Sequence, residues 1–309
     1  MNNTQKKIAV LLAAYNGTEW LQEQIDSILN QVNVNITIFI SIDESTDNTL
    51  EKCILLSKKY NNIVILPSIG RMGSASKNFF RLVRDVDLIQ FDYVAFADQD
   101  DIWNQDKLFR AVTQLKNTNA DAYSSNVTAF WENGKQCLIN KAQSQVKYDY
   151  MFESAGPGCT FVLTKKIALK LQKFLIINQL SCDKISMHDW FIYAFLRSHN
   201  YQWFIDNHSS MLYRQHNNNV IGANIGLKTA LIRWKKLRQG WLVEQSILIA
   251  DVVGYSDKPP IIWLKRLNIL DRIKLIKNIF SYRRRFREKI ILALFFMIYT
   301  VPKQEKIIF

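Results

Sequence analysis

The 309-residue sequence contains four cysteines, and their spacing matches no common metal or disulfide pattern. Cys53, Cys137, Cys159 and Cys182 lie far apart and form no CxxC or Cys/His ligand pair, which argues against a zinc site and a small disulfide framework. The N-terminal stretch MNNTQKKIAV also lacks the apolar segment and small-residue cleavage site of a signal peptide. From these absences we expect a protein of the cytoplasm.

Repeats and long low-complexity segments are absent too, so we expect an ordered globular chain. Hydrophobic residues make up 48% of the sequence and aromatic residues 12%, enough for one large α/β domain with an appendage. Residues 1–227 carry 22 Lys and Arg against 21 Asp and Glu, whereas residues 228–309 carry 18 against 6. We predict a balanced domain over 1–227 and a basic helical region over 228–309. That region would bind phosphate groups of lipid or nucleic acid, or would simply present a solvated helical surface.

Apolar runs that alternate with helical patterns indicate repeated βα units. The expected strands cover residues 8–14, 36–42, 63–66, 94–97, 122–130, 137–139, 201–205 and 211–216, and the stretch 154–163 is expected to form a glycine turn that leads into a further strand. The expected helices cover 19–29, 49–60, 165–174 and 190–196, with a further helix after the loop at 70–78. This order requires right-handed crossovers and a mostly parallel sheet with helices on both faces. The polar clusters that follow the strands would then gather at one edge of the sheet.

Three carboxylates, Asp98, Asp100 and Asp101, follow the apolar strand at 94–97. In an open α/β sheet, ligands bind at the carboxyl ends of the strands, and clustered carboxylates become tolerable when a hard divalent cation shares them. A helix N-cap would need only one of them, so the cluster favours a metal and phosphate site. For Asp101 alone, capping of the following helix is an equal alternative.

The small-residue loop at 70–78 matches no nucleotide-binding motif by itself. Gly70 and Gly73 have neither the Walker spacing nor the GxGxxG spacing. The start of the following helix, with Ser76, Lys77 and Asn78, would still suit a diphosphate, because the free N–H groups at a helix N-terminus attract anions.

With these residues in hand, about the first 225 positions resemble the family 2 glycosyltransferases of the GT-A fold. The closest likeness is to the bacterial rhamnosyltransferase-type branch that builds cell-surface polysaccharides. The matching elements occur in the family's order: AYNG at 14–17, Asp43 with STD at 45–47, DQDDIW at 98–103, HDW at 188–190 and YRQH at 213–216. Ile42 and Glu44 depart from the family's DDGS pattern, and the QxxRW motif of processive polymerases is missing. The second departure favours transfer of single residues.

The resemblance implies a Rossmann-like, mostly parallel sheet sandwiched by helices, and an inverting, metal-dependent sugar transfer. The implied donor is a nucleoside diphosphate sugar, dTDP-L-rhamnose above all, and the acceptor is a hydroxyl of a growing lipid-linked polysaccharide of O-antigen or capsule type. Asp98, Asp100 and His216 would bind Mg²⁺ or Mn²⁺. Asp189 would be the general base, although on the residues alone it would be read as a helix cap.

The resemblance also implies binding residues for the two substrates. The nucleotide-sugar contacts would come from Ala14, Tyr15, Asn16, Asp43, Ser76, Lys77, Asp98, Gln99 and Arg214. The acceptor contacts would come from Gly156, Gly158, His188 and Trp190.

The basic C-terminal region has the pattern of a membrane-surface segment. Cations alternate with apolar residues and tryptophans over 228–241, and the run 265–289 holds ten cations and two carboxylates. The apolar run 290–301 has twelve residues, too few to cross a bilayer. We predict docking on the cytoplasmic face of a membrane; packing of these helices on the first domain is the alternative.

Three other functions compete with this prediction. The chain could transfer another hexose in the same type of pathway, or it could be a non-catalytic protein that binds anionic lipid or nucleic acid through its basic region. A sugar nucleotidyltransferase would carry a Gly-rich, basic loop after its first strand, where this sequence has AYNGTEW. Glycosyl transfer fits best, and we expect no nucleic-acid partner.

Overall fold

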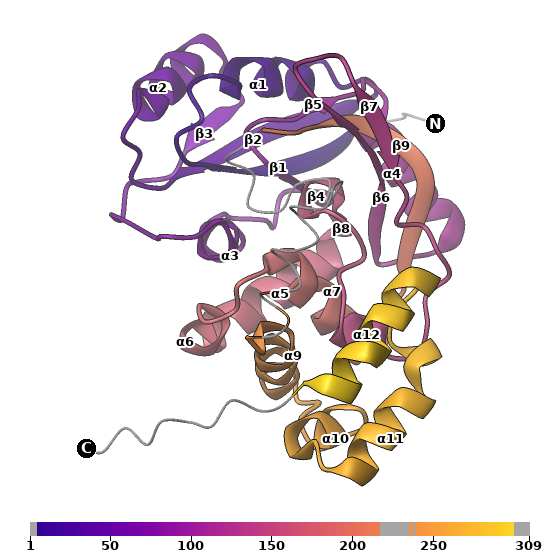
Figure 1. The fold of residues 1–309 in the computed structure, drawn as a ribbon. Helices are drawn as coiled ribbons and strands as arrows, with labels where there is room; N and C mark the ends of the chain where they lie inside the picture. The colour runs from indigo at the N-terminus through magenta and orange to yellow at the C-terminus, as the bar shows by residue number, and fades with distance from the viewer. Residues whose placement is uncertain (1–4, 217–234, 236, 238, 300–309) are drawn as a thin grey trace, which may run out of the picture. The chain divides into compact units, whose positions relative to one another are not determined.

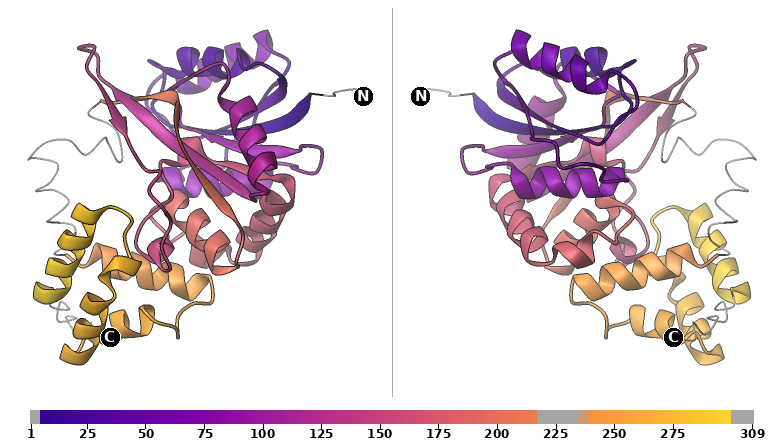
Figure 2. Two further views of the ribbon diagram at one scale, coloured as in Figure 1. Left: turned by 90° about the vertical axis from the view of Figure 1, so that its right-hand side faces the viewer. Right: turned by 90° about the vertical axis from the view of Figure 1, so that its left-hand side faces the viewer.

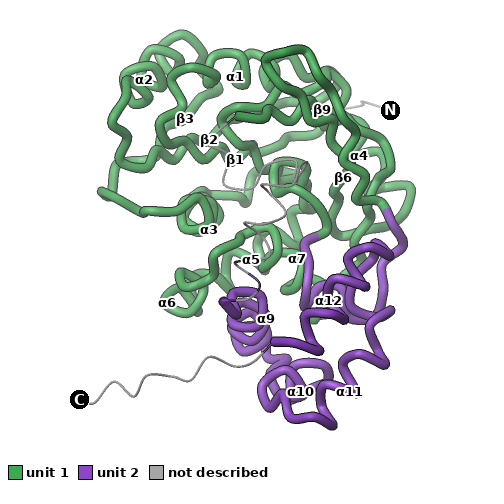
Figure 3. Tube along the Cα trace, in the orientation of Figure 1, with its two compact units in different colours: residues 1–142, 155–222 green, residues 143–154, 223–309 purple. Residues whose placement is uncertain are grey.

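The structure is a computed structural model, and it describes residues 5–216, 235, 237 and 239–299. The chain forms two compact units (Figure 3). Unit 1 contains residues 1–142 and 155–222, and unit 2 contains residues 143–154 and 223–309. A short segment from the middle of the chain, residues 143–154, thus belongs to the same unit as the C-terminal helices. A single boundary near residue 227 does not show this.

The sheet of unit 1 begins with four parallel strands in the order β3-β2-β1-β4. Their bounds are β1 Lys6–Ala14, β2 Val34–Ile42, β3 Ile63–Ile65 and β4 Tyr93–Ala97. The apolar runs in the sequence predicted all four. Residues 8–12 of β1 are fully buried because helices cover both faces of this part of the sheet.

The sheet continues from β4 through β8 (Val162–Thr164), β6 (Ala122–Phe130), β9 (Trp203–Arg214) and β5 (Ile102–Trp103). β8 is antiparallel to β4 and to β6, whereas β9 is parallel to β6, so this half is mixed. β7 (Gln136–Ile139) extends β6 as an antiparallel hairpin whose turn contains Gly134 with φ 79°. The expected α/β fold is confirmed: the first four strands are all parallel, and the second half of the sheet combines antiparallel pairs with the parallel pair β6 and β9.

Two strands predicted at 201–205 and 211–216 form the single strand β9. The polar residues between them suggested a break, but they stay in the sheet through irregular pairing with β6. Asp206 is buried there, and its carboxylate accepts hydrogen bonds from the guanidinium of Arg110 at 2.8 and 3.1 Å and from the Tyr123 hydroxyl at 3.1 Å. Polar residues can continue a buried strand when such partners satisfy them.

Helices cover both faces of the sheet in unit 1. α1 (Leu21–Leu29) and α2 (Thr49–Lys59) lie on one face, and α3 (Ala75–Asp85) and α5 (Lys165–Ile177) lie on the other (Figure 1). α4 (Lys107–Thr118) packs against β6 and β9 (Figure 2). The remaining helices are η2 (Gly158–Thr160), α6 (Gln179–Cys182) and α7 (His188–Ser198). Short loops between these elements leave the ends of β1, β2 and β4 at one edge.

Unit 2 is helical, as predicted for the C-terminal region. Its elements are η1 (Asp149–Met151), α9 (Trp241–Val252), α10 (Ile261–Arg266), α11 (Ile269–Lys277), η3 (Ile279–Ser281) and α12 (Phe286–Ile298). The ring of Phe152 lies 4.9 Å from that of Tyr282 and 6.2 Å from that of Phe296, measured between centroids. Within the described residues, no helix has the length and hydropathy to cross a membrane.

A buried ion-pair cluster ties the segment 143–154 to the helices of unit 2. Arg284 is fully buried, and its guanidinium lies 3.0 Å from the Asp149 carboxylate and 3.6 Å from that of Glu153. Its backbone N–H also donates to Glu153 at 2.7 Å. A buried charge is costly without a partner, and these two carboxylates compensate the charge of Arg284. This arginine of the basic run therefore lies in the interior of unit 2 and does not add to its surface charge.

Candidate active site at the carboxyl ends of the strands

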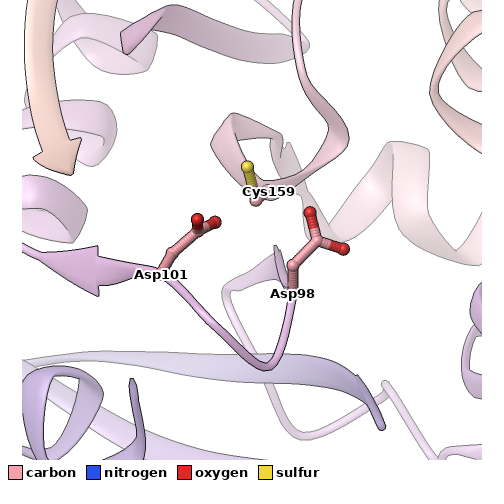
Figure 4. A group of neighbouring side chains, drawn as sticks. All are labelled: Asp98, Asp101 and Cys159. Carbon is pink, nitrogen blue, oxygen red and sulfur yellow. The ribbon is translucent and has the colours of Figure 1, made fainter. Parts of the chain in front are cut away.

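The acidic loop leaves β4 after Ala97 and turns into β5. The carboxylates of Asp98 and Asp101 project from this loop toward the segment that carries Cys159 (Figure 4). One oxygen of each carboxylate and the Cys159 sulfur all lie within 4.8 Å of one another. Asp101 is fully buried, and its Oδ2 has no hydrogen-bond partner among the described residues. The group therefore has the composition and size to hold a metal ion.

Burial and mutual repulsion raise the pKa values of these acids. Burial, together with the nearby charges of Asp100 and Asp189, raises the pKa of Asp98 to about 7. Burial, with the charges of Asp100 and Asp98, raises the pKa of Asp101 well above its ordinary value. A divalent cation would offset this repulsion, and the carboxylate oxygens are ligands of the type that Mg²⁺ and Mn²⁺ prefer. The residues present therefore fit the expected metal.

Asp100 contacts a residue that is distant in the sequence. Nε2 of His216, which follows the end of β9, lies 2.7 Å from Oδ2 of Asp100. The imidazole stacks on Trp20 with ring centroids 4.1 Å apart, so its plane is fixed. The structure thus brings together Asp100 and His216, two of the three predicted metal ligands, while Asp98 lies in the group with Asp101 and Cys159.

Arg214 braces the acidic loop from β9. Its backbone N–H donates to Asp101 at 3.2 Å, its Nε donates to the carbonyl of Asp100 at 2.8 Å, and its guanidinium pairs with Glu23. The capping alternative for Asp101 is wrong, because α4 begins at Lys107 and Asp106 occupies its N-cap position. Two residues between the acidic loop and the helix form β5, a strand that the sequence did not reveal.

Gln99 joins the acidic loop to the turn after β1. Its side-chain oxygen accepts the Tyr15 N–H at 2.7 Å, and its amide nitrogen donates to the Tyr15 carbonyl at 2.7 Å. The same side chain lies over Gly17, where an added Cβ would come 2.2 Å from the Gln99 oxygen. The Tyr15 side chain remains half exposed. Gln99 therefore sets the position of the turn that was predicted to hold the nucleotide.

The loop after β2 is tied to the same turn. Asn16 accepts the Thr46 N–H at 2.8 Å, and the Asn16 N–H donates to the Ser45 hydroxyl at 3.1 Å. Asp43 is buried, and its carboxylate accepts the N–H groups of Met72 at 2.7 Å and Gly73 at 2.8 Å. Asp43 therefore holds the 70–73 loop in this structure, and a nucleotide base that bonded to it would replace these contacts.

The start of α3 contains two structural residues that the sequence did not reveal. Ser74 caps the helix through the Lys77 N–H, and Ser76 is buried. The Asn78 amide donates to the carbonyl of Ser41 at 3.0 Å and to that of Ala14 at 3.4 Å, so it ties together the ends of β1 and β2. The Arg81 guanidinium donates to the Ser41 hydroxyl at 3.0 Å. The side chains of Asn78 and Arg81 are both buried, and no local sequence pattern indicates this burial.

The predicted base and three of the four predicted acceptor residues lie at the start of α7 or against it; Gly156 lies beside Ser125, Lys141 and Thr160 instead. Asp189 is half-buried in the first turn of the helix, and its Oδ1 accepts the Trp190 N–H at 2.7 Å. His188 stacks on Phe79 with ring centroids 4.0 Å apart, and Gly158 lies against its Nε2. Burial lowers the pKa of His188 to about 3, so the ring is neutral. Trp190 is buried, and Gly156 lies 3.5 Å or more from its neighbours at the Cβ position.

Lys107 is a further residue that the sequence gave no reason to select. Its side chain is buried with Nζ 3.5 Å from the centroid of the Trp103 ring. Burial lowers its pKa to about 8, while the charges of Cys159 and Asp101 act in the opposite direction. A lysine at a helix start normally lies in solvent; here it places a cation beneath the acidic loop.

A mixed α/β sheet with an acidic loop at the carboxyl end of its central strand is typical of the GT-A fold. The comparison with known proteins agrees. Residues 9–174 match the family described as Glycosyl transferase family 2, and the chain belongs to that family. It is therefore a glycosyltransferase, as the sequence motifs predicted.

One relative and two solved structures illustrate the similarity. The chain is 48% identical to dTDP-rhamnosyl transferase RfbG of Shigella flexneri over 79% of this chain and 84% of that protein. It is 13% identical to residues 1–349 of TarS from S. aureus in complex with UDP-GlcNAc, covering 88% of this chain and 79% of that one with a TM-score of 0.52. It is 12% identical to the mannosyltransferase PcManGT of Pyrobaculum calidifontis in complex with GDP-Man and Mn²⁺, covering 96% and 85% with a TM-score of 0.53. At this low identity the two structures support the fold alone.

Proposed function

We propose that the protein transfers L-rhamnose from dTDP-L-rhamnose, with inversion, to a hydroxyl group of a growing, lipid-linked cell-surface polysaccharide. The name of the 48% identical relative, dTDP-rhamnosyl transferase, supports the donor. The contact between Asp100 and His216 carries the catalytic part of the proposal, because it joins a carboxylate of the acidic loop to an imidazole 116 residues further along the chain. Another hexose donor is the alternative that the donor assay below decides.

Asp98, Asp100 and His216 would hold Mg²⁺ or Mn²⁺. When bound, the cation supplies Lewis-acid stabilisation of the charge that develops on the leaving diphosphate. Arg214 keeps the acidic loop in place through its bonds to Asp101 and Asp100, and it adds positive charge close to the phosphates. The nucleotide part of the donor would bind at the loops that contain or adjoin Tyr15, Asn16, Asp43, Ser76, Lys77 and Gln99.

Asp189 would accept the proton of the acceptor hydroxyl as the new glycosidic bond forms. Asp189 lies in the first turn of α7, so the helix fixes the backbone that carries its carboxylate. The electrostatic effect of Asp189 on Asp98 supports a location close to the acidic loop. A single in-line displacement by the acceptor oxygen then requires no covalent enzyme intermediate and inverts the anomeric centre.

A donor panel tests the proposal. The purified full-length protein is incubated with dTDP-L-rhamnose, UDP-glucose, UDP-galactose and GDP-mannose in the presence of Mn²⁺, Mg²⁺ or EDTA, and release of the nucleoside diphosphate is measured. We expect turnover of dTDP-L-rhamnose that EDTA abolishes and either metal restores. Preferential turnover of a UDP-hexose would overturn the donor assignment, and full activity in EDTA would overturn the role of the metal.

We further propose that the enzyme works at the cytoplasmic face of the cell membrane, where a lipid-linked acceptor would be available. The net charge of the last 82 residues supports this location, since 18 Lys and Arg stand against 6 Asp and Glu. Residues 217–234, 236 and 238, which hold most of the first basic amphipathic pattern, lie outside the described residues.

A further inference from the structure

Helix α12 is apolar on two opposite sides. Leu292, Phe295 and Phe296 point into unit 2 and are at most 3% exposed. A second stripe follows the spacing i, i+4, i+8, i+11 and i+12 and is exposed to solvent: Phe286 65%, Ile290 48%, Leu294 49%, Met297 57% and Ile298 57%. The core of unit 2 uses only one of the two sides. In the part of the chain that the structure describes, this second stripe is an uncovered hydrophobic surface along the helix.

The stripe continues onto η3. The ring of Phe280 is 61% exposed and lies 6.4 Å from that of Phe286 between centroids. We call Phe280, Phe286, Ile290, Leu294, Met297 and Ile298 the outer stripe. Such a row of large apolar side chains is uncommon on a protein surface that only water contacts, and it indicates a binding face.

Cations without a carboxylate partner accompany the first turn of this stripe. Arg287 and Lys289 flank Phe286, and Lys289 Nζ lies 5.0 Å from the Phe280 ring. Among the described residues, no carboxylate lies within ion-pair distance of either cation. The nearest candidate, Glu288, pairs with Arg283 at 3.4 Å and Arg285 at 3.7 Å. The described residues of unit 2 therefore do not neutralise the positive charge at this end of the stripe.

The charge and the length of α12 favour a bilayer as the occupant of this face. A second copy of the chain would offer the same apolar stripe, which carries no carboxylate that could pair with these cations. An anionic lipid surface would neutralise them while its acyl chains accept the apolar side chains. With 13 residues, α12 is about 20 Å long, which is too short to span a membrane but suits a helix lying in the plane of the interface.

We infer that the outer stripe of α12 and η3 is the membrane-docking face of the enzyme. It inserts into the headgroup region of an anionic bilayer with α12 parallel to the surface, and Arg287 and Lys289 contact lipid phosphates. This inference deepens the proposed function and rests on it for the membrane-bound acceptor. It assigns the docking to the exposed side of two described elements.

Vesicle sedimentation of the full-length protein tests the inference. The vesicles contain phosphatidylcholine alone or phosphatidylcholine with 30 mol% phosphatidylglycerol, each at low and high salt. We expect binding to the anionic vesicles that weakens with salt. The Ile290→Glu/Leu294→Glu variant should lower the partition coefficient at least tenfold. The Arg287→Gln/Lys289→Gln variant should lower it about tenfold at low salt and much less at high salt.

The matched control places the same two charges on an exposed apolar pair in unit 1. Ile177 and Leu180 are 68% and 85% exposed, so the Ile177→Glu/Leu180→Glu variant changes surface hydrophobicity elsewhere in the chain. It should bind vesicles like the unmodified protein. Melting curves confirm that all variants are folded.

Two results would overturn the inference. The first is full-length protein that stays in the supernatant with anionic vesicles at low salt. The second is vesicle binding that the outer-stripe variants leave unchanged, or that falls equally in the control. If light scattering shows a dimer that Ile290→Glu/Leu294→Glu dissociates, and vesicles bind neither form, the stripe is an interface between copies. Release of dTDP from the soluble donor is measured for each variant, so loss of docking and failure of the proposed chemistry give different readouts.

Discussion

Replacing Gly158 by alanine should distort the start of α7, where the proposed base lies. The backbone of Gly158 lies outside the left-handed region, so alanine fits its dihedral angles. Its Cβ, however, would come 2.3 Å from Nε2 of His188 and 3.1 and 3.3 Å from two ring carbons. The imidazole cannot simply swing away, because it stacks on the fully buried Phe79 at 4.0 Å.

The ring must therefore move by roughly 1 Å, or the η2 segment must move away from α7. Overpacking of this kind costs about 1–3 kcal/mol of unfolding free energy. For a unit of the size of unit 1, each kcal/mol lowers the melting temperature by about 2–4 °C, so we expect a decrease of about 2–12 °C. Because Asp189 follows His188 directly, kcat should fall while the binding of donor stays unchanged.

Gly156 provides the matched control. An alanine Cβ there would lie 3.5 Å from the Ser125 carbonyl and 3.8 Å from both Lys141 and Thr160, which are ordinary contacts. The Gly156→Ala variant should melt within about 2 °C of the unmodified protein. Removing the obstructing ring should relieve the clash, so the Gly158→Ala/His188→Ala double variant should be less destabilised than the sum of the single changes by about 1 kcal/mol or more. Equal melting of the two alanine variants, or additive single and double changes, would refute the reasoning.

Three further predictions concern the site. Asp100→Ala removes the partner of His216 and a charged oxygen ligand, so metal-dependent turnover should be lost while the exposed Asp106→Ala control stays active; retained turnover with an unchanged metal requirement would contradict it. Asp189→Asn should bind donor normally, by calorimetry, but turn over at least about 10²-fold more slowly; near-normal turnover with weakened donor binding would move Asp189 to the donor site. His188 should make unit 1 less stable in acid, because its folded pKa of about 3 lies below the ordinary 6.5. The unfolded chain then takes up the extra proton as the pH falls below about 6.5, so stability is full above that pH and decreases toward pH 3. Between pH 7 and pH 5 the effect is at most about 2 kcal/mol, and melting curves of His188→Ala should show a smaller loss over that range. An identical pH dependence in both proteins would show that folding does not lower the pKa of the imidazole.

The order of elements in unit 1 could be predicted because it depends on local patterns. The buried strands β1, β2 and β4 are mainly apolar runs, and each is followed by polar residues at the edge of the sheet. The acidic loop could be identified for the same reason, since three carboxylates directly after a buried strand are conspicuous in sequence. The motifs also sufficed to identify the glycosyltransferase family.

Contacts between distant residues could not be predicted in this way. No local pattern shows that the Gln99 amide pairs with the backbone of Tyr15, or that Asp43 holds the loop at Met72 and Gly73. Polar side chains such as Asn78 and Lys107 look like surface residues in sequence, yet both are buried beside the site. Their burial depends on which elements pack over them.

The basic C-terminal region shows the same division between sequence and tertiary structure. Its composition showed that it is strongly cationic, and the spacing of its apolar residues predicted helices. Only the packing decided that Arg284 is buried with Asp149 and Glu153, whereas Arg287, three residues later, remains on the surface. Likewise, the apolar residues of α12 are indistinguishable in hydropathy, and only the position of the neighbouring helices separates the buried side from the exposed stripe. Local patterns are set by each segment's own side chains, but burial is set by what the rest of the chain places against them.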